Sequence, residues 1–457
     1  MELQILFTKE QPKYVSIYEQ IKGKIIQQQL LADEKLPSKR KLAEQLHVST
    51  QTVQIAYEQL ISEGYIYSVE RSGYYISAYS GDWKQDIHPI ISSTERTETQ
   101  PKFNFKNGQV DADSFPYNIW LKLYRKQLNT QPIHNSNWQG EQSLRIEIAR
   151  YIQMARDIVC NADQIFIYSG TQQQLQALCT FFGKVPIATE NPGFFRATTI
   201  FEQNKHPIEY VQVDEYGATI PMTSCRLYYV TPAHQYPLGH IMPVERKIQL
   251  LQWAKDAECY IIEDDYDAEF RYKGLPIPPL AQLDQLQQVI YFGTFSKTLI
   301  PSIRVSYMIL PASLAKQFQA FNRHQKATVS KIDQLVIANF MATGYYSKHI
   351  EKMRTLYRKK RQLLIQALQT YLSKECNIIG DAAGLHLIVQ LPPWLTEKKA
   401  VQLALDEGIA IDAVSTCYQI NIPQNAVMVG FGAIPLKEIP SAIQLLAKSW
   451  LNAKECM

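Results

Sequence analysis

The first part of the chain carries hydrophobic residues at helical spacing in three consecutive stretches. Residues 14–28, 38–46 and 49–61 each place apolar side chains three or four positions apart, which predicts three amphipathic helices. Ser38 and Ser49 stand where the second and third helices would begin, and serine is a favoured N-cap because its hydroxyl accepts a hydrogen bond from a free backbone amide. The short connection between these two helices predicts a helix-turn-helix.

The pattern changes to strand-like alternation after Gly64. Residues 65–69 and 74–76 alternate and flank the turn Glu70-Arg71-Ser72-Gly73, which predicts a β-hairpin with Arg71 at its tip. A helix-turn-helix followed by such a hairpin is a winged helix, and the second helix of that motif is the one that enters the major groove of DNA.

Polar residues at the start of the third helix are therefore candidates for DNA contact. They are Ser49, Thr50, Gln51 and Thr52, of which Gln51 and Thr52 are best placed to meet base edges. The basic residues expected on phosphates are Lys35, Lys39, Arg40, Lys41 and Arg71. The alternative is a small helical protein-interaction module with a basic edge. The order of helix, turn, helix and wing favours DNA binding.

Residues 79–102 are polar and show no hydrophobic period over most of their length, so we expect a flexible linker there. It would join a winged-helix domain, residues 1–78, to a larger domain, residues 103–457.

From Phe103 onward, short apolar runs alternate with amphipathic helical stretches. The runs at 165–168, 227–230, 259–262 and 289–292 are apolar throughout, as is typical of strands in a parallel sheet covered by helices on both faces. The region is therefore predicted to be α/β. Ligands of such sheets bind beyond the carboxyl ends of the strands.

Residues able to bind a cofactor follow these runs directly. Gly170-Thr171-Gln172 would open a helix whose amides suit a phosphate, and Asp264 follows the third run. The fourth run leads to Thr294, Ser296 and Lys297, with Arg304 seven residues beyond the lysine. A lysine for a Schiff base, an aspartate for a pyridine nitrogen and an arginine for a phosphate together suit pyridoxal phosphate (PLP). Taken singly, each also has an ordinary interpretation as a helix cap, a turn or a surface ion pair.

Composition limits the partners, the localisation and the metal sites that can be expected. A net charge of +4 does not by itself indicate a nucleic-acid partner, so any DNA-binding surface must be local. There is no apolar run long enough to span a bilayer and no signal-peptide pattern at the N-terminus, so we expect a cytoplasmic protein. The seven cysteines are scattered without metal-ligand spacing, and no metal site is expected.

Specific motifs mark the N-terminal stretch. They are Leu36-Pro37-Ser38-Lys39-Arg40, Leu42-Ala43, Val48-Ser49, Thr52-Val53, Ala56-Tyr57, Leu60 and Glu63-Gly64-Tyr65. Through them, about the first eighty residues resemble the winged-helix domain of the GntR family of bacterial regulators. Thr50 stands where that family commonly carries Arg.

A second set of motifs runs from Phe103 to the C-terminus. It comprises Asn107-Gly108, Phe115-Pro116, Gly140 with Leu144-Arg145, residues 169–173, Pro192-Gly193-Phe194, residues 231–239, residues 263–267, Phe270-Arg271-Tyr272 and residues 293–297. This region resembles a fold-type I aminotransferase, with a large parallel-sheet lobe and a smaller α/β lobe. With the winged helix in front, the whole chain resembles the MocR/GabR-type subfamily of GntR regulators.

The resemblance implies a role toward PLP for each matching residue. Lys297 would form the Schiff base, Asp264 would meet the pyridine nitrogen, Tyr266 the phenolic oxygen, and Phe194 would stack on the ring. The phosphate would be held by Gly170, Thr171, Gln172, Thr294, Ser296 and Arg304. The small lobe would combine residues 103 to about 130 with residues from about 311 to 457. A homodimer is expected, since in proteins of similar fold the partner completes each PLP site.

Together these patterns predict a cytoplasmic, PLP-dependent transcriptional regulator that binds operator DNA and senses PLP, an amine or an amino acid. Two alternatives remain open: an active aminotransferase with an accessory DNA-binding domain, and a DNA-binding protein with an inactive cofactor fold. Met428 stands where aminotransferases commonly place the arginine that binds the substrate carboxylate. We therefore expect weak or absent transamination, with Arg196 as a candidate effector-binding cation.

Overall fold

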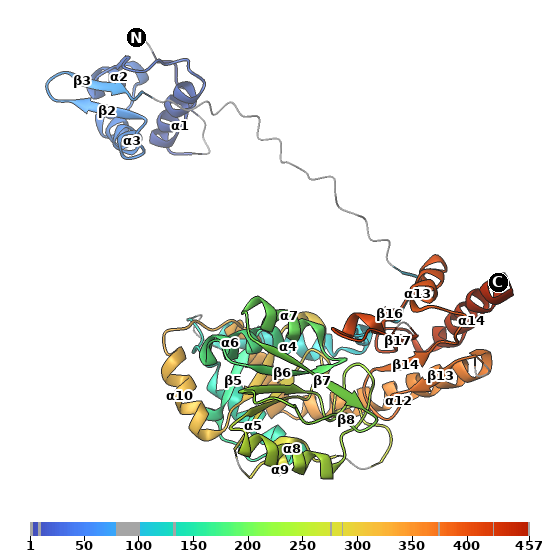
Figure 1. Ribbon diagram of the computed structural model, residues 1–457. Coiled ribbons are helices and arrows are strands. Elements are labelled where there is room, and N and C mark those ends of the chain that lie inside the picture. Colours follow the sequence, from blue (N-terminus) through green and yellow to red (C-terminus); the bar gives the residue numbers. More distant parts are fainter. Residues whose placement is uncertain are drawn as a thin grey trace. The chain divides into compact units, whose positions relative to one another are not determined.

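The computed structural model describes residues 3–7, 11–78, 101–130, 134–274, 277–285, 287–372, 375–423 and 425–455. The chain divides into two compact units, Met1–Glu98 and Thr99–Met457 (Figure 1). Most of the expected linker, residues 79–100, lies outside the described residues, so the linker stays a prediction. None of the described helices combines the length and apolar character needed to cross a membrane.

The first unit is a winged helix. Its elements are α1 Lys13–Ile26, β1 Lys35–Leu36, α2 Lys39–Leu46, α3 Thr50–Ser62, β2 Ile66–Val69 and β3 Gly73–Ile76. The three strands form an antiparallel sheet in the order β1-β3-β2. The predicted helices and hairpin are all present, apart from small shifts at their ends.

The helix-turn-helix is stabilised by N-caps on both helices and by a buried contact between them. Ser38 and Ser49 each accept a hydrogen bond from the amide three residues later, as predicted. His47 makes the turn between α2 and α3 in the left-handed region, at φ 50°. Tyr57, which is 1% exposed, donates to the carbonyl of Pro37 at 2.9 Å and ties α3 to the start of α2.

The second unit is built from two lobes. The elements of the large lobe are α4 Tyr117–Thr130, α5 Gln142–Arg156, β5 Ile165–Tyr168, α6 Thr171–Phe182, β6 Ile187–Asn191, α7 Phe195–Gln203, β7 Ile208–Asp214, β8 Gly217–Ala218, β9 Leu227–Val230, α8 Val244–Asp256, β10 Tyr260–Asp264, α9 Leu280–Leu283, β11 Val289–Thr294, β12 Ser306–Ile309, α10 Ala312–Asn322 and α11 Lys331–Ala342. Short 3-10 turns lie at Ala112–Ser114, Ala162–Gln164 and Pro301–Ile303.

The central sheet has eight strands in the order β5-β12-β11-β10-β9-β6-β7-β8. The sheet is mixed, because β12 runs antiparallel to β5 and β11, and β8 runs antiparallel to β7. The connection from β11 to β12 holds only a short 3-10 turn and no covering helix, and a parallel return would need a longer crossover. The four predicted strands, β5, β9, β10 and β11, do run in the same direction.

Helices cover both faces of this sheet (Figure 1). Along β11, Ile290 and Phe292 pack in the cluster with α6, α7 and α10, whereas Tyr291 packs in the cluster with α5 and α11. Because successive side chains of a strand point to opposite faces, a strand covered on both sides is apolar throughout.

Apart from its first strand, the small lobe follows the long helix α12 Tyr345–Leu372. Its elements are β4 Phe103–Asn104, β13 Asn377–Ile379, β14 His386–Gln390, α13 Glu397–Asp406, β15 Ile409–Ala410, β16 Asp412–Ala413, β17 Ala426–Gly430 and α14 Ile439–Glu455, with 3-10 turns at Val414–Cys417 and Leu436–Glu438. Four strands form a sheet in the order β13-β14-β17-β16, and β15 pairs with β4.

The expected extent of the small lobe needs correction. Phe103, Phe105 and Val110 do join its core, but Leu123 of α4 packs in the large-lobe cluster with α5 and α11. Helices α10 and α11 also pack on the large lobe, where Phe318 is fully buried. The helical periodicity of these segments was visible in the sequence, but which sheet they cover depends on long-range contacts.

Candidate functional site

The ends of the parallel strands bring most of the predicted cofactor residues together. β5 leads through Ser169 and Gly170 into α6, β10 ends at Asp264, and β11 ends at Thr294, just before Ser296 and Lys297. Since β5, β10 and β11 run in the same direction, their carboxyl ends lie at one edge of the sheet.

Lys297 lies partly buried at this edge. A Cβ added at Gly108 would come within 3.6 Å of Lys297 Nζ, so the loop after β4 also borders the amine. Burial lowers the pKa of Lys297, while the carboxylates of Asp267 and Asp264 oppose that shift. A lowered pKa makes the neutral, nucleophilic amine more accessible.

Asp264 is 5% exposed at the end of β10. The hydroxyl of Tyr229 donates to Asp264 Oδ2 at 2.5 Å. Burial raises the pKa of Asp264 to about 7; Asp265 and Asp267 add to the rise, whereas Tyr229 and Lys297 oppose it. A carboxylate in this position is stabilised by a cation placed against it.

The start of α6 and Arg304 meet closely. Gly170 has φ +111°, and a Cβ there would lie 2.3 Å from Arg304 Nη2, so only glycine fits without displacing the guanidinium. Arg304 donates from Nη2 to the carbonyl of Ser169 at 3.0 Å. Thr171 and Gln172 form the first turn of α6, where backbone amides have no partner within the helix.

Two hydroxyls stand beside Lys297. Thr294 Oγ1 accepts a hydrogen bond from the amide of Ser296 at 3.1 Å. Ser296 Oγ is buried without a hydrogen-bond partner. An unpaired hydroxyl, the amides that open α6 and the guanidinium of Arg304 are together suited to an anion such as a phosphate.

An aromatic group lies next to these residues. The ring of Tyr236 is 5.8 Å from that of Phe194 and 6.1 Å from that of Tyr266, edge-on in both cases. The hydroxyl of Tyr266 donates to the carbonyl oxygen of His234 at 3.0 Å and lies equally close to Nδ1 of that ring.

Four residues at this edge were not predicted from the sequence as site residues: Tyr229, His234, Tyr236 and Asp267. Tyr229 belongs to an apolar run, and no pattern in the sequence indicates that its hydroxyl contacts Asp264. The loop that holds His234 and Tyr236 follows β9 directly, and its position at a strand end was the available signal.

The two residues expected near an effector occupy different surroundings. Arg196 is exposed, and its guanidinium lies 5.1 Å from the ring centre of Phe195; its charge also contributes to lowering the pKa of Lys297. Met428 is 1% exposed in β17 and packs in an apolar cluster with Ile388, against which Tyr236 also packs.

The candidate DNA-contacting surface lies on the first unit. Thr50 and Gln51 are exposed at the start of α3, whereas Thr52 shares a 2.7 Å hydrogen bond with the hydroxyl of the capping residue Ser49. Thr52 is therefore engaged in the cap, which leaves Gln51 as the better placed of the two predicted readers.

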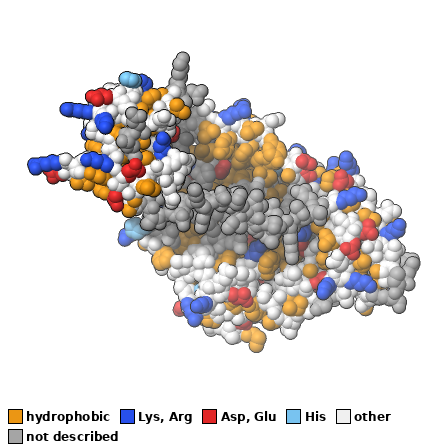
Figure 2. All heavy atoms as spheres, turned by 90° about the horizontal axis from the view of Figure 1, so that it is seen from above, with side chains coloured by type: hydrophobic (Ala, Val, Ile, Leu, Met, Phe, Trp, Pro, Cys, Tyr) orange, Lys and Arg blue, Asp and Glu red, His pale blue; other side chains and the backbone are white. Residues whose placement is uncertain are grey.

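Basic side chains flank this helix. Lys35 and Lys39 place their amines 5.7 Å and 5.9 Å from the ring centres of Tyr75 and Tyr74 in the wing. Arg40 and Lys41 are exposed on α2, and Arg71 is exposed at the tip of the wing with φ 59°. On the face drawn in Figure 2, Lys and Arg side chains are interspersed with Asp and Glu.

Comparisons with known proteins match both units. Residues 13–76 match the family described as bacterial regulatory proteins, gntR family, and residues 100–426 match aminotransferase class I and II. The uncharacterized HTH-type transcriptional regulator YdeL of Bacillus subtilis (strain 168) is 39% identical over 97% of this chain and 98% of its own length. The probable rhizopine catabolism regulatory protein MocR of Rhizobium meliloti is 28% identical over 96% of this chain and 94% of its own.

A solved structure supports the fold of the second unit. The multiple substrate aminotransferase of Thermococcus profundus matches with a TM-score of 0.69 and 22% identity, covering 79% of this chain and 93% of that one. Because a GntR winged helix precedes an aminotransferase fold, and relatives with the same arrangement match nearly end to end, the chain belongs to the MocR/GabR-type subfamily of GntR-family transcriptional regulators.

Proposed function

We propose that this regulator binds PLP at Lys297 and that occupancy of the site by PLP, or by an amine that reacts with it, changes how the winged helix binds operator DNA. The observation that carries the proposal is the placement of Asp264 and Lys297, whose charges act on each other, at the sheet edge that also holds the unpartnered hydroxyl of Ser296 and the guanidinium of Arg304.

The residues present fit the chemical groups of PLP. A dianionic phosphate suits the Ser296 hydroxyl, Arg304 and the amides that open α6, where Gly170 leaves room for close approach. A protonated pyridine nitrogen suits Asp264, a buried carboxylate whose pKa is raised to about 7. Thr171, Gln172 and Thr294 would complete the phosphate site.

Bound PLP would supply an aldehyde that primary amines attack and a ring that accepts electrons. Lys297 would provide the amine that holds it, and its lowered pKa favours the neutral form that this bond needs. Phe194 would stack on the ring, and Tyr266 would turn its hydroxyl from the carbonyl of His234 to the phenolic oxygen. Asp264 would hold the proton on the pyridine nitrogen.

The effector step would use the exposed Arg196 to attract an anionic amine. Met428 lies in the small-lobe strand where an aminotransferase would need an arginine, and its thioether packs in an apolar cluster that cannot bind a carboxylate. This observation favours weak or absent transamination over the alternative of an active aminotransferase with an accessory DNA-binding domain. A homodimer acting on DNA in the cytoplasm is part of the proposal.

The test is a comparison of DNA affinity with cofactor occupancy. Full-length protein freed of cofactor is titrated with PLP, and then with a panel of primary amines, while visible absorbance and operator binding are followed together. We expect binding of PLP or of one amine to change DNA affinity by at least about fivefold, a usual coupling between two sites. Coloured protein whose DNA affinity is the same in every state would overturn the sensing step, and the lack of any bound chromophore would overturn the cofactor assignment.

A further inference from the structure

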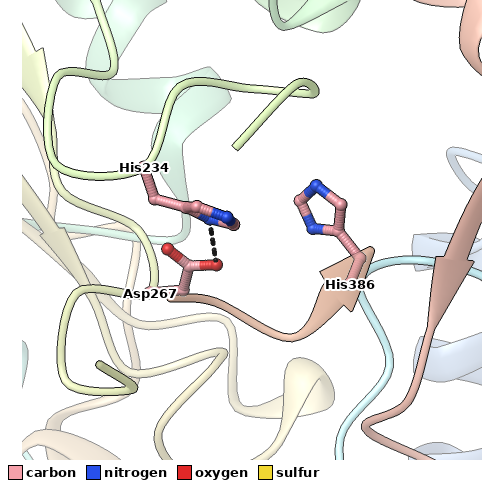
Figure 3. Close-up of side chains that lie close together, drawn as sticks. All are labelled: His234, Asp267 and His386. Carbon is pink, nitrogen blue, oxygen red and sulfur yellow. Dashed lines mark hydrogen bonds and ion pairs between the residues drawn. The ribbon is translucent and has the colours of Figure 1, made fainter. Parts of the chain in front are cut away.

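Three buried polar side chains meet where the small lobe contacts the large one. His234 lies in the loop after β9, Asp267 in the loop after β10, and His386 at the start of β14 (Figure 3). Their exposed fractions are 2%, 2% and 1%. One ligand atom from each residue lies within 4.8 Å of the other two, and Figure 3 shows the three side chains facing a common space.

The neighbours of the two imidazoles determine which ring nitrogen carries the proton. His386 Nε2 lies 2.8 Å from the carbonyl oxygen of Pro237, an acceptor, so Nε2 carries the proton and Nδ1 keeps a lone pair. His234 Nδ1 lies 3.1 Å from Asp267 Oδ2 and donates to it, so an ion shared with Asp267 would bind at Nδ1 in place of this proton. Both remaining nitrogens, His386 Nδ1 and His234 Nε2, are buried without a hydrogen-bond partner.

His386 has the arrangement in which imidazoles bind metal ions. Metal-ligating histidines almost always donate their other N–H to a carboxylate or a backbone carbonyl, which fixes the ring and leaves a lone pair for the ion. An unpaired buried nitrogen costs free energy unless it gains a partner, and His386 Nδ1 is such a nitrogen in the cluster with Asp267.

Two glycines pack closely against His234. A Cβ at Gly384 would lie 2.0 Å from His234 Cε1 and 2.6 Å from Asp267 Oδ2, and one at Gly239 would lie 3.1 Å from His234 Nε2. A side chain at either position would press on the proposed ligands.

We propose that His234, Asp267 and His386 bind a divalent first-row transition-metal ion, with Zn²⁺ as the best match for two imidazole nitrogens and one carboxylate oxygen. A water molecule would occupy the fourth position. None of the three residues is assigned to PLP, although His234 and Asp267 lie at the same edge of the sheet and Tyr266 touches His234.

Metal binding would also draw the lobes together. Ligand atoms around tetrahedral Zn²⁺ are about 3.4 Å apart, as expected for bonds of about 2.0–2.1 Å. The three ligand atoms here lie within 4.8 Å of one another, and His234 Nδ1 and Asp267 Oδ2 are already 3.1 Å apart, so any closing movement on ligation would be small. Since His386 belongs to the small lobe and the other two residues to the large lobe, an ion at this site would favour the closed arrangement.

Co²⁺ is the probe, because it accepts the same ligands as Zn²⁺ and its low-coordinate complexes absorb visible light. Full-length protein, treated with a chelator and without PLP, is titrated with Co²⁺ alone. We expect one equivalent to bind per chain with visible bands that Zn²⁺ abolishes. In His386→Phe, affinity should fall at least about 100-fold, since even loss of a partner outside the ligand set costs 10–100-fold.

His349→Phe is the matched control. His349 is also a buried histidine with an unpartnered Nε2, but it lies in α12 outside the cluster, and its variant should bind Co²⁺ like the original protein. A third variant, His386→Cys, decides the matter if His386→Phe does not fold, because a thiolate ligand adds a near-ultraviolet charge-transfer band to bound Co²⁺.

Two results would overturn the assignment. One is Co²⁺ binding that is absent from the original protein or unchanged in folded His386→Phe. The other is a folded His386→Cys protein that binds Co²⁺ without a thiolate band.

Discussion

Replacing Asp264 with asparagine should change stability and cofactor binding in opposite directions. In the protein without cofactor, Asp264 is buried, and burial raises its pKa to about 7 from an ordinary value of 3.8. An asparagine side chain in its place would keep an oxygen that accepts from the hydroxyl of Tyr229 but would carry no charge. The substitution therefore removes the cost of holding a buried carboxylate and also removes the partner proposed for a protonated pyridine nitrogen.

The sign and size of the stability change in Asp264→Asn follow from the pKa shift of Asp264. A carboxyl group with a raised pKa in the folded state destabilises the fold progressively as pH rises above its ordinary pKa, and the cost is complete above about 7. About three pH units at 1.4 kcal/mol each give a cost of about 4 kcal/mol at pH 8, against about 2 kcal/mol at pH 5.5. The stability that Asp264→Asn gains should thus grow by about 2 kcal/mol between these pH values.

The assay is thermal unfolding of the cofactor-free protein at both pH values, followed by titration with PLP. For a unit of this size, 2 kcal/mol corresponds to a relative increase of about 3 °C in the melting temperature of the variant at pH 8. Its affinity for PLP should fall because the carboxylate is lost. A melting difference that does not change with pH would refute the buried-charge argument, and undiminished PLP affinity would refute the role of Asp264.

Four further outcomes are expected. Lys297→Ala should lose the visible absorbance of bound PLP, whereas the control Lys316→Ala, at an exposed position in α10, should keep it. Borohydride-reducible absorbance in Lys297→Ala would contradict the assignment of Lys297 as the residue that binds PLP. Gln51→Ala should alter operator sequence preference, whereas Lys39→Ala should weaken all sequences alike and reduce the salt slope by about 1; an equal loss at every sequence would remove Gln51 from the readers. Transamination of common amino acids should be weak. Robust multiple-turnover transamination that is undiminished in Arg196→Ala would contradict this and would show that the protein is an enzyme. Sedimentation should show a homodimer at micromolar concentration, which a cofactor-loaded monomer would contradict.

Local patterns in the sequence were enough for the winged helix. Its helices bury residues such as Val53 and Leu60 at helical spacing, its caps are the serines that local hydrogen bonding favours, and its wing follows from alternation around a turn. These features depend on contacts between residues close in the chain, so their periodicity survives in the sequence. The same reasoning identified the four parallel strands of the large lobe.

The candidate cofactor residues were predictable for a related reason. Asp264 and Lys297 directly follow apolar strands, and parallel strands bring their carboxyl ends to one edge whatever the length of chain between them. A residue that directly follows a parallel strand can therefore be predicted to lie at this edge of the sheet.

Only the tertiary structure decided what lies across lobes and between distant strands. The central sheet is mixed because β12 runs antiparallel to β11. Helices α10 and α11 belong to the large lobe because their apolar faces pack in its core clusters. The cluster of His234, Asp267 and His386 joins two loops of the large lobe to a strand of the small one. No spacing in the sequence encodes that meeting, since it depends on how the two lobes pack.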